Sequence, residues 1–178
     1  HIDLVGKALD KINDKVLQKV VVSRKEDVVL SNFNVLDTYK KLLKTYPNAF
    51  VYVWFHPKVG LWFGATPETL LNISGVKFET MSLAGTQVFD SNKVVWENKE
   101  LEEQQLVTHF IEQQLKNITT NLTVDKTETV KAGNLLHLKT KVGGTLNNFS
   151  SLKELIRALH PTPAVCGLPR ENSKIFIN

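Results

Sequence analysis

The sequence predicts an α+β fold in which largely antiparallel sheets are flanked by helices. Short apolar segments bounded by turn residues outnumber the helical segments, and several of them pair as hairpins instead of alternating with helices. With 178 residues, of which 42% are hydrophobic and 22% charged, the chain has the size and composition of one soluble globular domain.

The N-terminal half is expected to hold two helices and several strands. Apolar residues recur at helical spacing over residues 2–16, and Asn34 can cap a second helix that continues to Tyr46 and is stopped by Pro47. Apolar runs predict strands over residues 20–22, 28–30, 49–55, 61–64, 70–73 and 76–80. The last four of these strands are expected to form two hairpins.

The C-terminal half is expected to begin with a long helix over residues 94–116. Its inner side should carry Leu101, Leu106, Val107, Phe110, Ile111 and Leu115. Strands over 122–124 and 135–140, a helix capped by Ser150 or Ser151 and ending at Leu159, and a Pro- and Gly-rich loop over 161–169 should follow. We expect no linker, and we interpret residues 1–178 as one partial domain of a longer polypeptide.

Charge and composition narrow the class of partner. The net charge of +4 is spread without a basic block, so we expect no nucleic acid, although a mild positive field suits a small anion. No apolar run is long enough to span a bilayer, and residues 1–9 do not have the pattern of a signal peptide. The single cysteine, Cys166, excludes an internal disulfide. We expect a cytoplasmic protein, and the oligomeric state stays open.

Three acidic residues are candidates for chemistry. Glu100 and Glu103 lie three residues apart on the long helix, so their carboxylates share a face and can hold a divalent cation, or else form part of a solvated acidic face. Glu68 ends the segment Gly64–Glu68, which we expect to form a tight turn. Apolar surroundings there would favour a protonated general acid, and the alternative is an exposed turn residue.

The other candidates are a lysine, a glycine-containing segment and a histidine. Lys19 precedes three valines and can act as a base if it is desolvated, or extend to water if it is not. Gly85 and Thr86 can bind a carboxylate or form an ordinary turn. His137, between two leucines, fits a core residue as well as a catalyst, and Cys166 fits a small buried hydrophobe.

Six short motifs occur in a fixed order along the chain. They are Lys-Val-Val-Val-Ser-Arg at 19–24, Phe-Gly-Ala-Thr-Pro-Glu at 63–68, Leu-Ala-Gly-Thr at 83–86, Asn-Lys-Glu-Leu-Glu-Glu at 98–103, His-Leu-Lys-Thr at 137–140, and Leu-His-Pro-Thr-Pro-Ala at 159–164 with Gly-Leu-Pro-Arg at 167–170. In this order they resemble the chorismate-binding enzymes over nearly the whole chain. The tract 160–164, Lys19 and Ala84 resemble the isochorismate synthase branch of that family.

The resemblance implies an enzyme that converts chorismate to isochorismate with Mg²⁺, for menaquinone or siderophore synthesis. The residue matching Lys19 activates water for attack at ring carbon two, and the residue matching Glu68 protonates the hydroxyl that leaves carbon four. The residue matching Glu103 binds Mg²⁺, with Glu100 as a neighbouring carboxylate. Gly85, Thr86 and His137 match residues that lie at the substrate.

The resemblance also leaves alternatives open. Relatives that make anthranilate, aminodeoxychorismate or salicylate share the motifs. Gln104 stands where many relatives have histidine, and Thr66 where serine is commoner. Relatives have an additional N-terminal portion, and C-terminal strands with a substrate-binding arginine and a second Mg²⁺ glutamate. We expect both portions to be absent here, so the chain by itself is also interpreted as a non-catalytic piece of such an enzyme.

Overall fold

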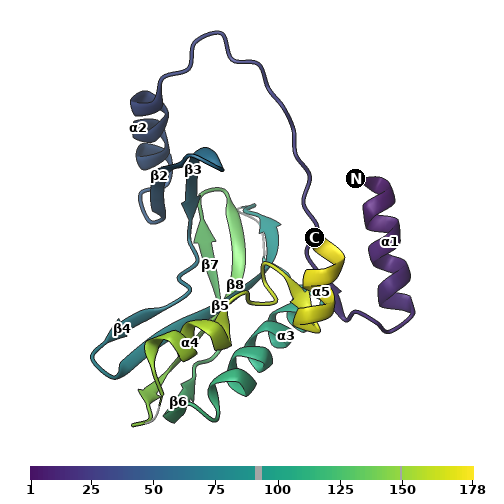
Figure 1. Ribbon diagram of the computed structural model, residues 1–178, viewed down its shortest axis with the longest axis vertical. Helices are drawn as coiled ribbons and strands as arrows, with labels where there is room; N and C mark the ends of the chain where they lie inside the picture. The colour runs from purple at the N-terminus through teal and green to yellow at the C-terminus, as the bar shows by residue number, and fades with distance from the viewer. Residues whose placement is uncertain (91–93, 149) are drawn as a thin grey trace.

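The computed structural model describes residues 1–90, 94–148 and 150–178 (Figure 1). In chain order its elements are α1 (Ile2–Asn13), β1 (Lys19–Val20), α2 (Val35–Thr45), β2 (Phe50–His56), β3 (Gly60–Thr66), β4 (Asn72–Ser74), β5 (Lys77–Val88), α3 (Asn98–Leu115), β6 (Thr119–Val124), β7 (Glu128–Ala132), β8 (Leu135–Leu146), α4 (Leu152–Leu159), β9 (Gly167–Leu168) and α5 (Arg170–Ile177). All strand pairs are antiparallel, so the predicted α+β class with antiparallel sheets is confirmed.

The main sheet has five strands in the order β4-β5-β8-β6, and β7 also pairs with β8. β8 reaches both β6 and β7 because it is 12 residues long and pairs with each through a different half. Side chains on one face of β5 and β8 are buried in alternation, as expected for strands with one covered face. This face carries the core.

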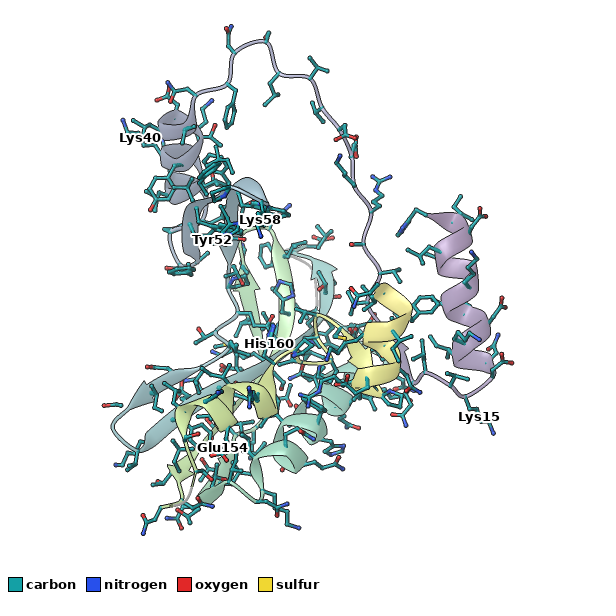
Figure 2. All side chains as sticks on the ribbon, in the orientation of Figure 1. Lys15, Lys40, Tyr52, Lys58, Glu154 and His160 are labelled. Atoms are coloured by element: carbon teal, nitrogen blue, oxygen red, sulfur yellow. The ribbon has the colours of Figure 1, made fainter. Side chains whose placement is uncertain are left out.

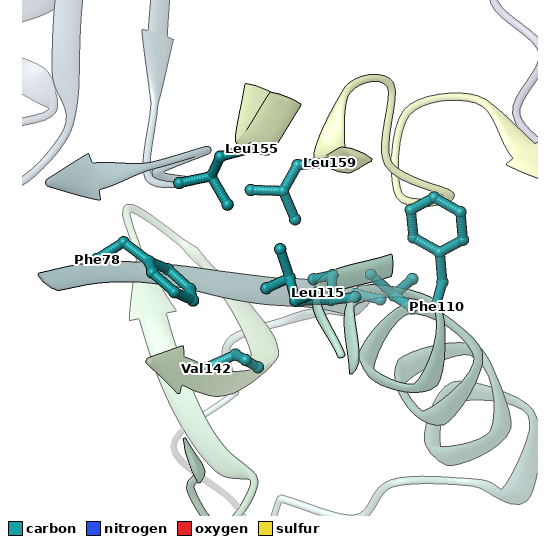
Figure 3. Close-up of a cluster of buried hydrophobic side chains, with 9 residues drawn as sticks. Phe78, Phe110, Leu115, Val142, Leu155 and Leu159 are labelled. Atoms are coloured by element: carbon teal, nitrogen blue, oxygen red, sulfur yellow. The ribbon is translucent and has the colours of Figure 1, made fainter. Parts of the chain in front are cut away.

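Helices α3 and α4 pack on the buried face of the main sheet (Figures 1 and 3). The core consists of Phe78, Ala84, Val107, Phe110, Ile111, Leu115, Val142, Leu155 and Leu159. Ser151 begins α4 with a capping box, in which its hydroxyl accepts from the Glu154 amide, as its place in the sequence predicted. Leu155 and Leu159 of α4 are thereby directed toward the sheet.

A second, two-stranded sheet joins the N-terminal segment to the C-terminal loop. Lys19 of β1 pairs with Leu168 of β9, and Val20 pairs with Gly167. A Cβ atom at Gly167 would overlap the Lys19 carbonyl oxygen and approach Ser173 Oγ to 2.6 Å. Glycine is therefore required where β9 pairs with β1, and this pairing fixes the backbone of Lys19.

The β2–β3 hairpin and α2 lie together at one end of the molecule, where Figure 2 shows Tyr52 and Lys58 well away from α4. Their pairing agrees with the predicted hairpin, and the Asn34 side chain accepts from the Asp37 amide as the expected N-cap. Trp54 and Trp62 stack with ring centroids 6.1 Å apart. Large apolar side chains on this hairpin remain exposed, among them Phe50, Trp54, Phe55, Leu61 and Trp62.

Several sequence predictions are wrong. Residues 28–30 are not a strand, and Val29 is 99% exposed. Residues 21–34 instead form a long connection without regular structure, although no linker was expected. An apolar run is buried only where another segment pairs with it, and polar residues flank this run on both sides. Leu101 is 40% exposed because it lies on the outer side of α3.

Two smaller differences concern the β-structure. β7 was not predicted because its sequence, Glu-Thr-Val-Lys-Ala, contains few strongly apolar residues. Gly64–Thr66 lie within β3, so the expected tight turn at Gly64–Glu68 is wrong.

Within the described part of the chain, no helix combines the length and the apolar character needed to cross a membrane.

Candidate functional site

Lys19 is held between the long helix and the proline-rich loop. Its ammonium donates to the Pro163 carbonyl at 2.8 Å and lies 3.0 Å from Glu103 Oε1. The Lys19 side chain is only 13% exposed. The alternative in which this lysine extends into water is therefore wrong.

Glu68 lies in the connection between β3 and β4 and is half-buried. Burial raises the pKa of the Glu68 carboxyl above its ordinary value of 4.5, and the nearby positive charge of Lys19 partly opposes this rise. The Glu68 amide donates to Thr66 Oγ1 at 3.2 Å, which fixes the turn of the chain after β3. Thus Glu68 holds its proton to higher pH than an exposed glutamate and lies within electrostatic range of Lys19.

Helix α3 gives its two candidate carboxylates different surroundings. Glu100 closes the capping box, because its Oε2 accepts from the Glu97 amide at 3.0 Å while Glu97 accepts from the Glu100 amide. The Glu100 side chain is 16% exposed and also contacts Lys99. Glu103, one turn later, is 39% exposed and faces Lys19. Of these two carboxylates, Glu103 is the one that lies beside Lys19.

Gly85 and Thr86 lie inside β5, where the register with β8 shifts between Ala84 and Thr86. The expectation that they form an ordinary turn is thus wrong: the segment is a β-bulge, and Gly85 adopts a φ of +69° that glycine tolerates. His137 Nδ1 lies 3.2 Å from both the Gly85 carbonyl oxygen and Thr86 Oγ1. In the tautomer with a proton on Nδ1, the ring donates to the Gly85 carbonyl, and in the other tautomer Nδ1 accepts from the Thr86 hydroxyl.

The bulge also determines how closely α3 approaches the sheet. A Cβ atom at Gly85 would lie 3.2 Å from the Cβ of Glu100. The missing side chain therefore lets the first turn of α3 rest directly on β5. Gly85, Thr86 and His137 form one hydrogen-bonded group next to this contact.

His137 also borders a cavity of about 540 Å³ between α2, the β2–β3 hairpin and the β7–β8 hairpin. Its other lining residues include Tyr46, Asn48, Ala65, Pro67, Lys131 and Gly133. One of these lining residues, Pro67, directly precedes Glu68 in the sequence. A histidine, a lysine and apolar walls suit a small anionic ligand with an apolar ring.

The proline-rich loop is held by α4 and α5. His160 follows α4 near the middle of the molecule (Figure 2), and Thr162 and Pro163 are buried. Arg170 Nη1 donates to the Ala158 carbonyl at 2.9 Å and to the Arg157 carbonyl at 3.3 Å, which caps the C-terminal end of α4. The loop thus presents the Pro163 carbonyl to Lys19 from a fixed position.

Sequence reasoning missed two parts of this arrangement. A backbone carbonyl such as that of Pro163 has no signal in the residue types, and Arg170 was noted only as the last residue of a motif. For Arg170, the nearest signal in the sequence was its position at the end of a motif that directly follows the proline-rich loop. Cys166 is buried, as expected of a small hydrophobe.

The described residues contain no cluster of three or more His, Cys, Asp or Glu side chains that could hold a metal. Mg²⁺, however, is commonly bound by one or two carboxylates and completed by water and substrate oxygens. Glu103 is a hard-oxygen ligand that is partly exposed beside the candidate base. Its chemistry therefore fits a Mg²⁺ ion that is shared with a substrate carboxylate.

A family model described as "Chorismate binding enzyme" matches residues 1–178. The chain belongs to this family. The six ordered motifs had predicted this membership, which is now confirmed.

Similar members of the family are isochorismate synthases. MenF of Haemophilus influenzae is 27% identical over 186 residues, which cover 99% of this chain and 43% of that protein. EntC of Escherichia coli K12 is 31% identical over 122 residues, 63% of this chain and 31% of that protein. The chain therefore spans less than half the length of these chorismate-binding relatives.

Solved structures show the same fold. A Bacillus anthracis protein described as a 2,3-dihydroxybenzoate-specific isochorismate synthase, DhbC, superposes with a TM-score of 0.89 at 29% identity, over 99% of this chain and 52% of that one. Anthranilate synthase component I of Streptococcus pneumoniae gives a TM-score of 0.82 at 22% identity, over 98% of this chain and 40% of that one. The second likeness concerns the fold alone. The predicted chorismate-utilising fold is confirmed.

Proposed function

We propose that this chain carries the base, the acid and one metal ligand of a Mg²⁺-dependent isochorismate synthase. The observation that carries the proposal is the 3.0 Å contact between Lys19 of β1 and Glu103 of α3, with Glu68 of the β3–β4 connection in electrostatic range of Lys19. Isochorismate synthases are also among the curated relatives that resemble the chain over nearly its whole length. Both observations favour the same reaction.

In the proposed reaction the residues exchange protons on the two sides of the chorismate ring. The Lys19 amine, in its uncharged form, takes a proton from water as the water oxygen bonds to ring carbon two. The ring double bonds shift, the carbon four–oxygen bond breaks, and Glu68 gives its proton to the hydroxyl, which leaves as water. One water enters and one leaves, so chorismate and isochorismate have the same composition.

The raised pKa of Glu68 supports the acid role, because a general acid must carry its proton when the bond breaks. The Pro163 carbonyl supports the base role by fixing the direction of the Lys19 nitrogen. Bound Mg²⁺ would hold the ring carboxylate of chorismate. Glu103 would hold the ion, with Glu100 behind it stabilising the start of α3.

Gly85, Thr86 and His137 would form one wall of the substrate site. His137 Nδ1 is within hydrogen-bond distance of Gly85 and Thr86, so His137 would orient the bulge and offer its ring to the substrate. Lys131 of the adjoining cavity supplies positive charge for a second carboxylate. These positions suit a dianionic ring compound such as chorismate.

A second proposal concerns the 178-residue chain itself. It spans 43% of MenF and 52% of the solved DhbC chain, and its described residues place one exposed carboxylate beside Lys19. We propose that these residues alone do not turn over chorismate, and that activity needs further ligands of the kind that the rest of the relatives' length can supply.

A product assay tests both proposals. The longest natural polypeptide that contains this sequence and the 178-residue chain are each incubated with chorismate and Mg²⁺, and the products are separated by chromatography. We expect isochorismate from the former and no product from the latter. Anthranilate, aminodeoxychorismate or salicylate from the longer polypeptide would contradict the first proposal, and turnover by the short chain would contradict the second.

A further inference from the structure

The residue after Glu103 is a buried amide. The Gln104 side chain is 3% exposed and lies on the sheet-facing side of α3. Its Nε2 lies 2.8 Å from Ser82 Oγ, 3.2 Å from the Ser82 carbonyl oxygen and 3.0 Å from Thr140 Oγ1. One side chain of α3 thus donates to both central strands, β5 and β8.

The acceptors of Gln104 belong to a larger polar cluster within the core. Ser82 and Thr140 are partners in the β5–β8 register. Thr108 Oγ1 lies 2.7 Å from Ser82 Oγ, and Thr127 Oγ1 lies 2.8 Å from Thr140 Oγ1. Hydrogen bonds are directional, so this cluster fixes α3 against rotation and sliding more strictly than apolar contacts do.

Packing alone does not account for a glutamine at this position. Gln104 Oε1 has no hydrogen-bond partner among the described residues. A buried acceptor without a partner lowers stability, whereas methionine would fill a similar volume without that loss. The role of Gln104 therefore lies in the hydrogen bonds that its N–H groups donate and not in the volume of its side chain.

The neighbour of Gln104 supplies the reason. Consecutive residues of an α-helix are about 100° apart around its axis, so the rotation that points Gln104 into the sheet also sets where Glu103 points. In that rotation Glu103 Oε1 reaches Lys19 Nζ at 3.0 Å. We propose that Gln104 is a positioning residue, which locks the rotation of α3 and so places the Glu103 carboxylate beside Lys19. This inference rests on the proposed function, in which Glu103 is the metal ligand and Lys19 is the base.

Three variants separate positioning from simple stabilisation. Gln104→Met keeps the volume and removes both N–H groups, Gln104→His keeps one ring N–H donor, and Thr127→Val removes a hydroxyl of the same cluster without touching α3. In the metal-free protein, the ¹⁵N NMR signal of the Lys19 ammonium, assigned with Lys19→Arg, reports its contact with Glu103. Mn²⁺ binding followed by electron paramagnetic resonance and chorismate turnover are measured on the same proteins.

We expect Gln104→Met to shift the Lys19 signal and to weaken Mn²⁺ binding by about 10- to 100-fold, the usual loss when a group that orients a ligand is removed. Gln104→His should recover most of that loss. Thr127→Val should lower the melting temperature while leaving the Lys19 signal and Mn²⁺ affinity at wild-type values. If Gln104→Met does not fold, Ser82→Ala, which removes one acceptor of the amide, is judged by the same two readouts.

An unchanged Lys19 signal in Gln104→Met would overturn the inference, as would equal changes in Gln104→Met and Thr127→Val. Failure of the proposed function looks different. In that case the wild-type longer polypeptide makes no isochorismate, while Gln104→Met still displaces the Lys19 signal, and the positioning role stands without the reaction.

Discussion

The Lys19 ammonium lies 3.0 Å from Glu103 Oε1, although one residue belongs to a two-residue strand near the N-terminus and the other to the long helix. The pairing of β1 with β9 brings Lys19 to this place, and the capped and anchored α3 brings Glu103. Glu68 lies within electrostatic range of Lys19.

Replacing Lys19 tests the proposed base. Lys19→Ala should lower the rate of isochorismate formation by about 10²- to 10⁴-fold, the usual contribution of general base catalysis. Lys19→Arg keeps a positive charge near Glu103 but cannot act as a base, because guanidinium stays protonated. It should be nearly as inactive. Chromatography of the products measures both, and a near-normal rate in Lys19→Arg would remove Lys19 from the base role.

Glu68 should make stability depend on pH. Its folded-state pKa is raised above the ordinary 4.5, so the protonated form favours folding, and this stability is lost as the pH rises through the folded-state pKa. Glu68→Gln cannot ionise. Its melting temperature should therefore exceed that of the wild type by more at about pH 8 than at about pH 4, which lies below the ordinary pKa of 4.5.

The control for that experiment is Glu102→Gln, on the exposed side of α3. The melting temperature of Glu102→Gln should differ from that of the wild type by the same amount at both pH values. If Glu68→Gln also differs from the wild type by the same amount at both pH values, burial of the carboxyl does not govern its protonation.

Gly167 holds the Lys19 backbone in place. Gly167→Ala should destabilise the protein by about 1–3 kcal/mol, because the added methyl group overlaps the Lys19 carbonyl oxygen and meets backbone that cannot yield without moving β1. Thermal unfolding measures the loss. Gly6→Ala is the matched change in open space on α1 and should be neutral or stabilising. Equal effects of the two changes would contradict a special role for the β1–β9 pairing.

Arg170 should hold the proline-rich loop. Arg170→Met removes two hydrogen bonds to the end of α4 and the contact over the Phe110 ring, whose centroid is 5.4 Å from the guanidinium carbon. The Val165 and Cys166 amides, which donate to Thr162, should then exchange hydrogen faster. Mass spectrometry of hydrogen exchange measures this. Unchanged protection in the loop would show that its prolines alone keep it rigid.

Local signals predicted much of the fold. The caps at Asn34 and Ser151 and the β2–β3 hairpin depend on residues close together in sequence, and the structure contains each of them. Residues 28–30 have equally apolar side chains and form no strand, because burial depends on a distant partner that the pattern cannot reveal. The bulge at Gly85 likewise depends on the register with β8, which a four-residue motif does not contain.

In the candidate site, too, the residue types could be predicted from local sequence, whereas the contacts between distant segments could not. The residue types at Lys19, Glu68 and Glu103 allowed a base, an acid and a metal ligand as well as ordinary structural roles, and the ordered motifs favoured the chemical roles. The proximity of Lys19 to Glu103 depends on β1 pairing with β9, a contact between the two ends of the sequence. The Pro163 carbonyl and the anchoring amide of Gln104 were missed because a backbone oxygen and a polar core residue have no distinctive pattern.

The most direct measurement follows the oxygen that the proposed reaction adds. Chorismate and Mg²⁺ are incubated with the longest natural polypeptide that contains this sequence in water enriched in ¹⁸O, and the product is analysed by mass spectrometry. If Lys19 activates water for attack at ring carbon two, isochorismate will carry ¹⁸O in the hydroxyl at that carbon, and Lys19→Ala will form it about 10²- to 10⁴-fold more slowly. Isochorismate without ¹⁸O at carbon two, or a product that contains an amine, would contradict the proposed site.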